Sequence, residues 1–471
     1  MSVARLDLTK RNQEEKGNKI LINHGKSAIS GLSFLYTFVN MIEKIYEAFL
    51  QSKGVSTDTR NIEKGVIFFA LKGPSFNANE FALSALEQGA AFAVIDENIN
   101  NSDARLLKVE DVLTTLQQLA YHHRTQLKKP VIALTGSNGK TTTKELIASV
   151  LSTTYCVHFT KGNLNNHIGV PLTLLGIKPE HDLVVVEMGA NHQGEIDMLC
   201  NIAYPDFGLI TNVGKAHLEG FGGFEGVIKG KTEMYRHLMK NDGVIFCNKS
   251  NVLLADQCKD YKKVVYYGFQ SGSSIYGKIE SSFPFLKVNW SKQNQNDSHD
   301  VNTHITGDYN LENVLAAITI GDYFNVTTEN TKRGIESYVP SNQRSQIIIK
   351  DSNTIILDAY NANPTSMEAA LKNLEENYEG KKIIILGEML ELGEESKKEH
   401  QHIVDLLLSI DKDRVILVGE HFIHTTLQEP ALRFSNSTDA MDFVKEQNFK
   451  DSIILIKGSR GSKMEKVLEA L

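Results

Sequence analysis

Residues 135–142 read TGSNGKTT and carry the residue types that bind a polyphosphate. They follow the apolar run VIAL at 131–134 and precede a helical pattern, so a glycine-rich turn would join a strand to a helix. Backbone N–H groups of such a turn surround a phosphate, a lysine reaches the outer phosphates and a hydroxyl binds Mg²⁺. A turn beside a surface lysine is the alternative. The expected ATP-binding residues are Thr135, Gly136, Ser137, Asn138, Gly139, Lys140, Thr141 and Thr142, with Lys140 catalytic and Thr141 also binding metal.

Metal ligands are expected near these phosphates, because the charge of a transferring phosphoryl group must be neutralised. Glu187 ends the apolar run LVVVE, and His217 lies shortly after the run FGLITNV. The carboxyl ends of strands line the ligand crevice of an open α/β sheet, so both residues are candidate metal ligands, and His217 is a candidate catalytic residue. A helix-capping glutamate and a solvent-exposed loop histidine are the alternatives.

Three lysines, Lys229, Lys231 and Lys240, follow on a predicted helix. Their spacing alone predicts solvent-exposed cations and does not single out any of them.

Short apolar runs alternate with helical patterns along the chain, which predicts an α/β fold. The central runs at 131–136, 183–189, 207–213 and 243–248 are continuously apolar, as in parallel strands that are buried on both faces. A chain of 471 residues is too long to fold around a single hydrophobic core of ordinary size. We therefore predict three domains: a small N-terminal α/β domain at 1–110, a central phosphate-loop ATPase domain with a mainly parallel sheet at 111–340, and a C-terminal Rossmann-like, doubly wound domain at 341–471.

Charge and composition exclude several classes of protein. A net charge of −7 gives no global basic surface for nucleic acid. The four cysteines form no CxxC pair, which predicts a reducing, cytoplasmic location without a disulfide framework. No apolar run is long enough for a transmembrane helix, so membrane insertion is not expected. We separately expect the protein to be a monomer.

The first forty residues carry no clear pattern. The apolar stretch at 29–39 suggests a signal peptide, but acidic residues precede it and no cleavage site follows. We expect the native chain to start at Met41, with residues 1–40 an upstream extension, which N-terminal mass analysis of the native protein would test.

The phosphate loop is shorter than the common pattern GxxxxGK[ST], because Leu134 stands where that pattern has its first glycine. Its form, TGxxGKT, resembles the loop of the Mur ligase family. The resemblance implies that Lys231, the second lysine of a KxK pattern, is carbamylated, is catalytic and binds Mg²⁺ with Glu187 and His217. A carbamate would turn a cation into the oxygen ligand that Mg²⁺ prefers. Two magnesium ions are expected.

Four further blocks resemble the branch of this family that adds D-alanyl-D-alanine. They are EMGANHQGEID at 187–197, DAYNANPTSMEAAL at 358–371, ILGEMLELGEES at 385–396 and IKGSRGSKME at 456–465. The resemblance covers the chain from Met41 to Leu471. It implies ATP and Mg²⁺ as cofactors, and UDP-N-acetylmuramoyl-tripeptide and D-alanyl-D-alanine as partners.

The resemblance also assigns substrate-binding residues. In VSTDTR at 55–60 it places the nucleotide sugar, and the hydroxyls and arginine there suit a pyrophosphate, although a polar turn is the alternative. The segment KGNLNNHIGVP at 161–171 matches a substrate-binding block. The family pattern FDGHDF is FNANEF here, at 76–81, which puts contacts by its Asp and His in question. The expected substrate residues are Ser56, Thr57, Asp58, Thr59, Arg60, Asn165 and Asn166.

Further ATP-binding residues are expected from the same resemblance. Tyr309 stands where many family members have histidine, and Gln343 replaces a glycine before Arg344. Closure of the C-terminal domain would bring two of these residues to the nucleotide. The residues are Asn310, Asn313, Arg344 and Asp358.

The implied reaction transfers the γ-phosphate of ATP to the tripeptide carboxylate, and the amine of D-alanyl-D-alanine then attacks the acyl phosphate. Another Mur-type ligase, such as folylpolyglutamate synthetase, is the nearest alternative. From a different class, a phosphate-loop switch or motor ATPase would turn over nucleotide without a small amine acceptor.

Overall fold

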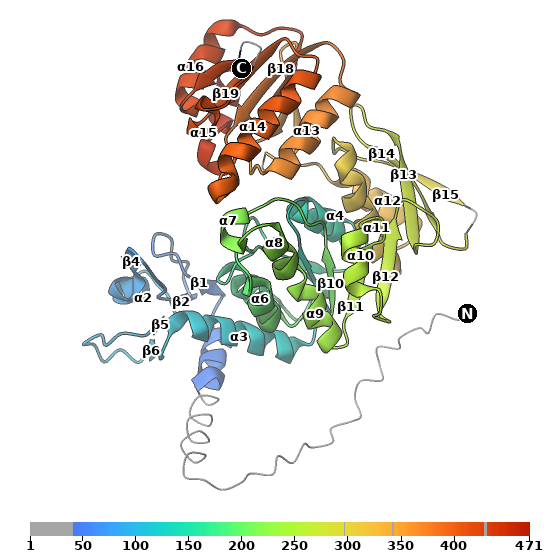
Figure 1. Cartoon of the computed structure of the whole chain (residues 1–471). Helices are drawn as coiled ribbons and strands as arrows, with labels where there is room; N and C mark the ends of the chain where they lie inside the picture. Colours follow the sequence, from blue (N-terminus) through green and yellow to red (C-terminus); the bar gives the residue numbers. More distant parts are fainter. Residues whose placement is uncertain (1–40, 296, 342, 428–430) are drawn as a thin grey trace.

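The computed structural model describes residues 41–295, 297–341, 343–427 and 431–471. Residues 1–40, which we expect to be an upstream extension, lie outside the described residues. The chain forms an α/β fold with three main sheets along the sequence, which confirms the predicted fold class (Figure 1). In the described part of the chain, no helix is both long and apolar enough to traverse a lipid bilayer.

The N-terminal sheet has four parallel strands in the order β1-β2-β5-β6. One face is covered by α2 (Ala82–Glu87), and the other packs on the helical residues 41–50 and on α3 (Val112–Leu127). The core on the α3 side continues into the central sheet, so these two parts share apolar residues. The strands are β1 (Val55–Ser56), β2 (Ile67–Phe69), β5 (Phe92–Ile95) and β6 (Leu106–Lys108), and a hairpin joins β3 (Lys72–Gly73) to β4 (Phe76–Asn77).

The central sheet has nine strands in the order β15-β14-β13-β12-β11-β10-β7-β9-β8. The predicted buried strands are its parallel core: β7 (Val131–Thr135), β9 (Leu183–Glu187), β10 (Phe207–Ile210) and β11 (Val244–Asn248). Parallel strands β8 (Val157–Phe159) and β12 (Val264–Gly268) flank them, and antiparallel hairpins of β13 (Ile275–Ser281), β14 (Lys287–Lys292) and β15 (Ser298–Asn302) extend the sheet.

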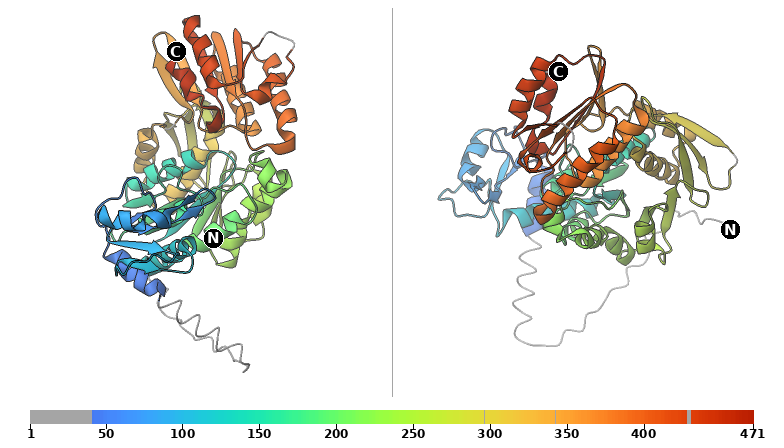
Figure 2. Two further views of the ribbon diagram at one scale, coloured as in Figure 1. Left: turned by 90° about the vertical axis from the view of Figure 1, so that its left-hand side faces the viewer. Right: turned by 45° about the horizontal axis from the view of Figure 1, so that its top comes forward.

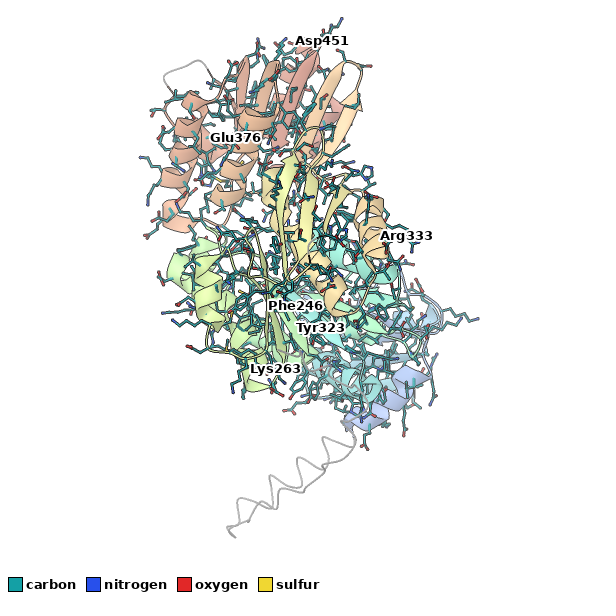
Figure 3. All side chains as sticks on the ribbon, turned by 90° about the vertical axis from the view of Figure 1, so that its right-hand side faces the viewer. Phe246, Lys263, Tyr323, Arg333, Glu376 and Asp451 are labelled. Atoms are coloured by element: carbon teal, nitrogen blue, oxygen red, sulfur yellow. The ribbon has the colours of Figure 1, made fainter. Side chains whose placement is uncertain are left out.

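Alternation along the buried strands explains their continuous apolar sequence. Val131 and Ala133 face the core on one side of β7, and Ile132 and Leu134 face the core on the other side. Helices α3, α5 (Gly169–Leu175), α6 (Glu195–Ala203) and α9 (Glu233–Lys240) cover the first face, whereas α4 (Lys140–Ser152), α11 (Leu311–Tyr323) and α12 (Thr328–Ser337) cover the second. Figure 3 shows Phe246 of β11 beside Tyr323 of α11, with ring centroids 5.3 Å apart.

The C-terminal sheet has six strands in the order β16-β17-β21-β18-β19-β20, with only edge strand β16 antiparallel. Helices lie on both faces, as in a doubly wound fold. In Figure 1 and the left view of Figure 2 this domain sits above the central domain. Its strands are β16 (Gln346–Lys350), β17 (Asn353–Asp358), β18 (Lys381–Gly387), β19 (Arg414–Val418), β20 (Leu432–Phe434) and β21 (Ser452–Lys457), and α13 (Pro364–Asn377), α14 (Ser396–Leu406) and α16 (Ser437–Gln447) are its longest helices.

Candidate active site

The predicted phosphate loop joins the end of β7 to the start of α4. Gly139 is the N-cap of α4 with φ 76°, and no side chain of the described residues caps the first turn of the helix. The N–H groups of that turn are therefore open to an anion. Lys140 folds back over the loop, where its Nζ donates hydrogen bonds to the carbonyl oxygens of Gly136 at 2.7 Å and Ser137 at 3.2 Å. Burial lowers the pKa of Lys140 to about 8.

The loop is braced by residues that follow β10. Thr211 Oγ1 donates to the carbonyl oxygen of Asn138 at 2.6 Å, and the Asn138 N–H donates to Asn212 Oδ1 at 2.9 Å. Ser137 Oγ donates to the Gly214 carbonyl oxygen at 3.1 Å. These contacts fix the loop before any nucleotide binds, which reduces the entropy lost on binding.

Gly136 is required by both conformation and packing. Its φ is 149°, and a Cβ at this position would lie 1.9 Å from Thr211 Oγ1. We expect Gly136→Ala to destabilise the protein by about 1–3 kcal/mol, since the clash displaces a well-packed side chain. The thermal midpoint measures the loss of stability, and the Kd for ADP measures the loss of nucleotide binding. The midpoint should fall and the Kd should rise, because Thr211 also holds the loop.

Gly54→Ala is the matched control for this substitution. Gly54 has the same φ of 149°, but a Cβ there would have no atom within 4 Å. Equal losses of thermal midpoint in the two variants would attribute the effect to backbone strain alone and contradict the packing argument.

Glu187 is a buried carboxylate beside the loop, with 1% of its surface exposed. Its Oε2 accepts a hydrogen bond from Thr141 Oγ1 at 3.0 Å, and its Oε1 accepts one from Asn165 Nδ2 at 2.8 Å. The nearest cation is Lys144, whose Nζ lies 3.9 Å from Glu187 Oε2. The carboxylate caps none of the described helices, so the helix-capping alternative is wrong. It faces the site with a hydroxyl beside it, a donor set suited to a hard cation.

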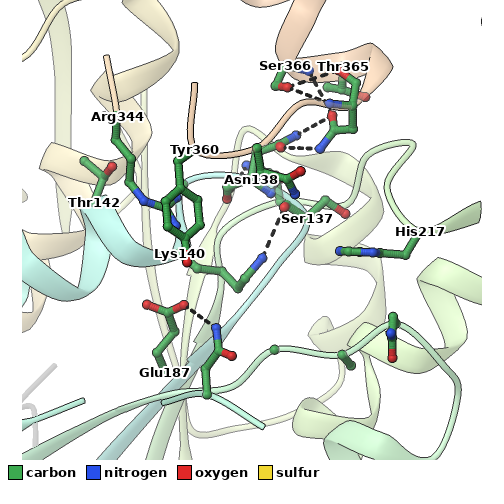
Figure 4. A pocket seen from close by; sticks show the side chains of 18 of the residues that line it. Ser137, Asn138, Lys140, Thr142, Glu187, His217, Arg344, Tyr360, Thr365 and Ser366 are labelled. Atoms are coloured by element: carbon green, nitrogen blue, oxygen red, sulfur yellow. Dashed lines mark hydrogen bonds between the residues drawn. The ribbon is translucent and has the colours of Figure 1, made fainter. Parts of the chain in front are cut away.

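His217 lies on the loop after β10, with φ 53°, at the start of α7 (Leu218–Phe221). Its Nδ1 contacts Glu391 Oε2, from the C-terminal domain. Figure 4 shows the His217 ring pointing toward the interior of the pocket.

Lys231 contradicts the expectation that the three lysines are exposed cations. Only 1% of its surface is exposed, and its Nζ donates to the Ala190 carbonyl oxygen at 3.0 Å. The Nζ also lies 5.0 Å from the centroid of the Phe221 ring. Burial lowers the pKa of Lys231 well below its usual range. Lys229, on the same α8 (Phe224–Lys231), is exposed.

Asn310 and Asn313 brace α11 against the phosphate loop. Thr143 Oγ1 donates to Asn313 Oδ1 at 2.8 Å, and Asn313 Nδ2 donates to Asn310 Oδ1 at 2.7 Å. A Cβ on Gly139 would lie 2.8 Å from Asn313 Oδ1. Much of their hydrogen-bonding capacity is therefore used within the protein.

The C-terminal domain already touches this region. The Arg344 guanidinium lies 3.7 Å from the centroid of the Tyr360 ring, and Asp358 Oδ2 accepts from Lys457 Nζ at 2.5 Å. Asn363, the N-cap of α13, donates from Nδ2 to Asn138 Oδ1 at 2.7 Å. In Figure 4 Arg344 and Tyr360 approach Lys140 from the side opposite Glu187.

These residues surround one cavity of about 780 Å³ between the central and C-terminal domains. Thr135, Gly136, Thr141 and Lys231 are not among the residues that line it. The predicted site residues that line it are Ser137, Asn138, Gly139, Lys140, Thr142, Asn165, Asn166, Glu187, His217, Asn310, Asn313, Arg344 and Asp358.

The predicted nucleotide-sugar segment at 56–60 is not part of this cavity. Arg60 donates from Nη2 to Asp58 Oδ2 at 2.7 Å, and their side chains are 86% and 46% exposed. This bidentate pair lowers the pKa of Asp58 to about 2. In the divergent FNANEF segment, Asn79 is buried and donates from Nδ2 to Asp96 Oδ1 at 2.9 Å, so its contact is internal.

Sequence reasoning missed several residues that line the cavity or hold its walls. Tyr360 and Asn363 lie in the block DAYNANP, from which only Asp358 was assigned. Asn212 follows β10, and Glu391 lies in the block ILGEMLELGEES. The sequence blocks indicated that these segments contribute to the site. Which side chain of each block faces the cavity depends on how the domains dock.

Comparisons with known proteins agree over most of the chain. Residues 134–321 match the Mur ligase middle domain, and residues 343–460 match the Mur ligase, glutamate ligase domain. The UDP-N-acetylmuramoyl-tripeptide–D-alanyl-D-alanine ligase of Bacillus subtilis is 37% identical, covering 89% of this chain and 93% of the relative. Its counterpart from Escherichia coli is 35% identical, covering 88% and 93%.

Solved structures give the same picture. MurF from Acinetobacter baumannii superposes with a TM-score of 0.79 at 32% identity, covering 91% of this chain and 97% of that one. MurF ligase from Thermotoga maritima in complex with ADP has a TM-score of 0.80 at 27% identity, covering 90% and 97%.

Proposed function

The chain belongs to the Mur ligase family, and we propose that it uses ATP to join D-alanyl-D-alanine to UDP-N-acetylmuramoyl-tripeptide. The products are ADP, phosphate and a UDP-linked muramoyl pentapeptide for peptidoglycan synthesis. A cytoplasmic location and a monomeric state are part of this proposal, because ATP and UDP-sugars are cytoplasmic metabolites and the cavity is built from a single chain.

One observation carries the proposal. A single cavity brings the phosphate loop, a buried carboxylate and residues of the C-terminal domain together. Phosphoryl transfer requires such convergence, since catalysis rests on positioning and on stabilisation of charge.

The proposed chemistry starts at the carboxylate of the tripeptide, whose oxygen is a poor leaving group. Transfer of the γ-phosphate converts it to an acyl phosphate and releases ADP. The amine of D-alanyl-D-alanine attacks the acyl carbon, loses a proton, and the tetrahedral intermediate expels phosphate. Lys140 and the N–H groups of the loop stabilise charge on the transferring group. Asn363 and Arg344, from the C-terminal domain, help to close the cavity against water.

Mg²⁺ fits the donor groups at this site, of which Glu187 and His217 line the cavity, whereas Thr141 and Lys231 do not. Glu187 is buried with the Thr141 hydroxyl beside it, and the nearest ammonium group among the described residues, that of Lys144, lies 3.9 Å from its Oε2. We propose that Thr141, Glu187, His217 and carbamylated Lys231 hold Mg²⁺, in all two ions. When bound, the metal neutralises charge on the phosphates.

The nucleotide sugar is assigned to Ser56, Thr57, Asp58, Thr59 and Arg60 in the N-terminal domain, and Asn165 and Asn166 to the peptide end. Since Arg60 pairs with Asp58 in this structure, the guanidinium must turn from that carboxylate to bind a pyrophosphate. We also propose that the domains divide near residues 110 and 340. The nucleotide is assigned contacts with Asn310, Asn313, Arg344 and Asp358.

Incubation with ATP, Mg²⁺, UDP-muramoyl tripeptide and D-alanyl-D-alanine is expected to give the UDP-linked pentapeptide. Mass spectrometry of the nucleotide sugar, together with assays of ADP and phosphate, measures the result. L-Glutamate and diaminopimelate are the control amines, and preferential stimulation by either would indicate another ligase of the family. Formation of AMP and pyrophosphate would contradict the acyl-phosphate route.

A further inference from the structure

A loop of the C-terminal domain reaches the proposed metal site of the central domain. The loop joins β18 to α14 and lies in the block ILGEMLELGEES, to which the proposed reaction gives no role. Its Glu391 carboxylate contacts Nδ1 of His217, a residue that lines the main cavity. Glu391 does not itself line that cavity, so among the described residues its link to the site is the contact with His217.

The contact is fixed from both sides. His217 and Glu391 both adopt left-handed backbone conformations, with φ 53° and 63°. Such conformations are rare for residues other than glycine, are strained and concentrate at functional sites. The next residue, Leu392, is buried in one apolar cluster with Leu218 and Phe221, so the two strained residues are held by packing across the domain interface.

The same cluster also supports Lys231. The Phe221 ring lies under its Nζ, and a Cβ on Gly230 would lie 2.4 Å from that ring. Leu392 therefore packs in one cluster with Leu218, which follows His217, and with Phe221, which contacts Lys231. His217 and Lys231 are both proposed metal ligands.

The chemistry of the two side chains determines which of them donates the hydrogen bond in this contact. A carboxylate only accepts hydrogen bonds, so the Nδ1 of His217 must carry the proton that it donates to Glu391. Nε2 then keeps its lone pair and is the nitrogen available to a metal. Histidines that bind metals commonly donate their second N–H to a carboxylate, which fixes the tautomer and the ring orientation.

We propose that Glu391 is a positioning residue that completes the metal site from the C-terminal domain by holding His217 with Nε2 free for Mg²⁺. This inference rests on the proposed function, because it takes His217 as a metal ligand. It makes metal affinity depend on domain docking, since the two residues belong to different domains.

The test is Mn²⁺ binding to the full chain with ADP present, followed by electron paramagnetic resonance. Glu391→Ala is expected to weaken Mn²⁺ binding roughly 10- to 100-fold, whereas Glu391→Gln, whose amide oxygen still accepts from Nδ1, should lose less. Glu394→Gln is the matched control, because Glu394 lies on the same loop, is exposed and makes no hydrogen bond to the described residues. Mn²⁺ affinity of Glu391→Ala within twofold of wild type, or an equal loss in Glu394→Gln, would overturn the inference.

A double-mutant cycle separates positioning from a general structural role. If Glu391 acts through His217, Glu391→Ala should change Mn²⁺ affinity less than twofold in a His217→Ala background. The same loss in both backgrounds would overturn the inference. Pentapeptide formation by the wild-type protein is measured separately: its absence would refute the proposed function, whereas its presence with unchanged Mn²⁺ binding in Glu391→Ala would refute this inference alone.

Discussion

Lys140→Ala is expected to lower kcat by roughly 10²- to 10³-fold, the cost of removing a donor aimed at developing negative charge. Lys140 Nζ now binds carbonyl oxygens of its own loop at 2.7 and 3.2 Å, so it is held beside the place where phosphates would lie. The rate of ADP release with saturating substrates measures the effect. The thermal midpoint should change little, because these bonds are local to the loop.

The pKa of Lys140 adds a second readout. Burial lowers it to about 8, so part of the population is neutral near that pH when no nucleotide is bound. Binding of ADP phosphates favours the charged amine, and the wild-type protein should therefore take up protons on binding at pH 8. Calorimetry in buffers of different ionisation enthalpy measures this uptake. Lys161→Ala, at an exposed lysine outside the cavity, is the control; proton uptake that persists in Lys140→Ala would contradict the assignment.

The parts of the fold that the sequence predicts well are those buried on both faces. In β7, β9, β10 and β11 each face meets a helix layer, so the positions before the carboxyl end are almost all apolar and the run is conspicuous. Edge strands lack this constraint. β16 exposes Ile349 at 69%, and β20 is only Leu432–Phe434, so neither forms a long apolar run and both escaped prediction.

The site divides in a similar way. The phosphate loop is predicted because its glycines, lysine and threonine act within one local turn. Glu187 is predicted because it ends a recognisable strand. The partnership of Asn138 with Asn363 and that of His217 with Glu391 join residues far apart in the chain, and no local pattern encodes domain docking. Burial of Lys231 is also tertiary, since its helix alone predicts an exposed cation.

Lys231→Ala is expected to lower kcat/KM by about 10²-fold or more, because a metal-ligand oxygen contributes several kcal/mol of charge stabilisation. A lysine reacts with CO₂ only as the neutral amine, forming the N–C bond of a carbamate and releasing one proton. Burial lowers the pKa of Lys231 well below its usual range, which increases the fraction of the side chain that is present as the neutral amine. The ligase assay measures the loss, and a short carboxylate such as formate should restore part of the activity by replacing the carbamate oxygens.

Lys229→Ala is the matched control, because Lys229 lies on the same helix but is exposed. It should keep wild-type activity, and formate should not affect it. Removal of CO₂ should lower the activity of the wild-type protein and bicarbonate should restore it, while Lys231→Ala should respond to neither. Full activity of Lys231→Ala without formate would exclude the ligand role, because a buried methyl group has no oxygen to offer a metal. A loss that formate does not rescue, with no dependence of the wild type on CO₂, would make Lys231 a packing residue held by Phe221 and the Ala190 carbonyl instead.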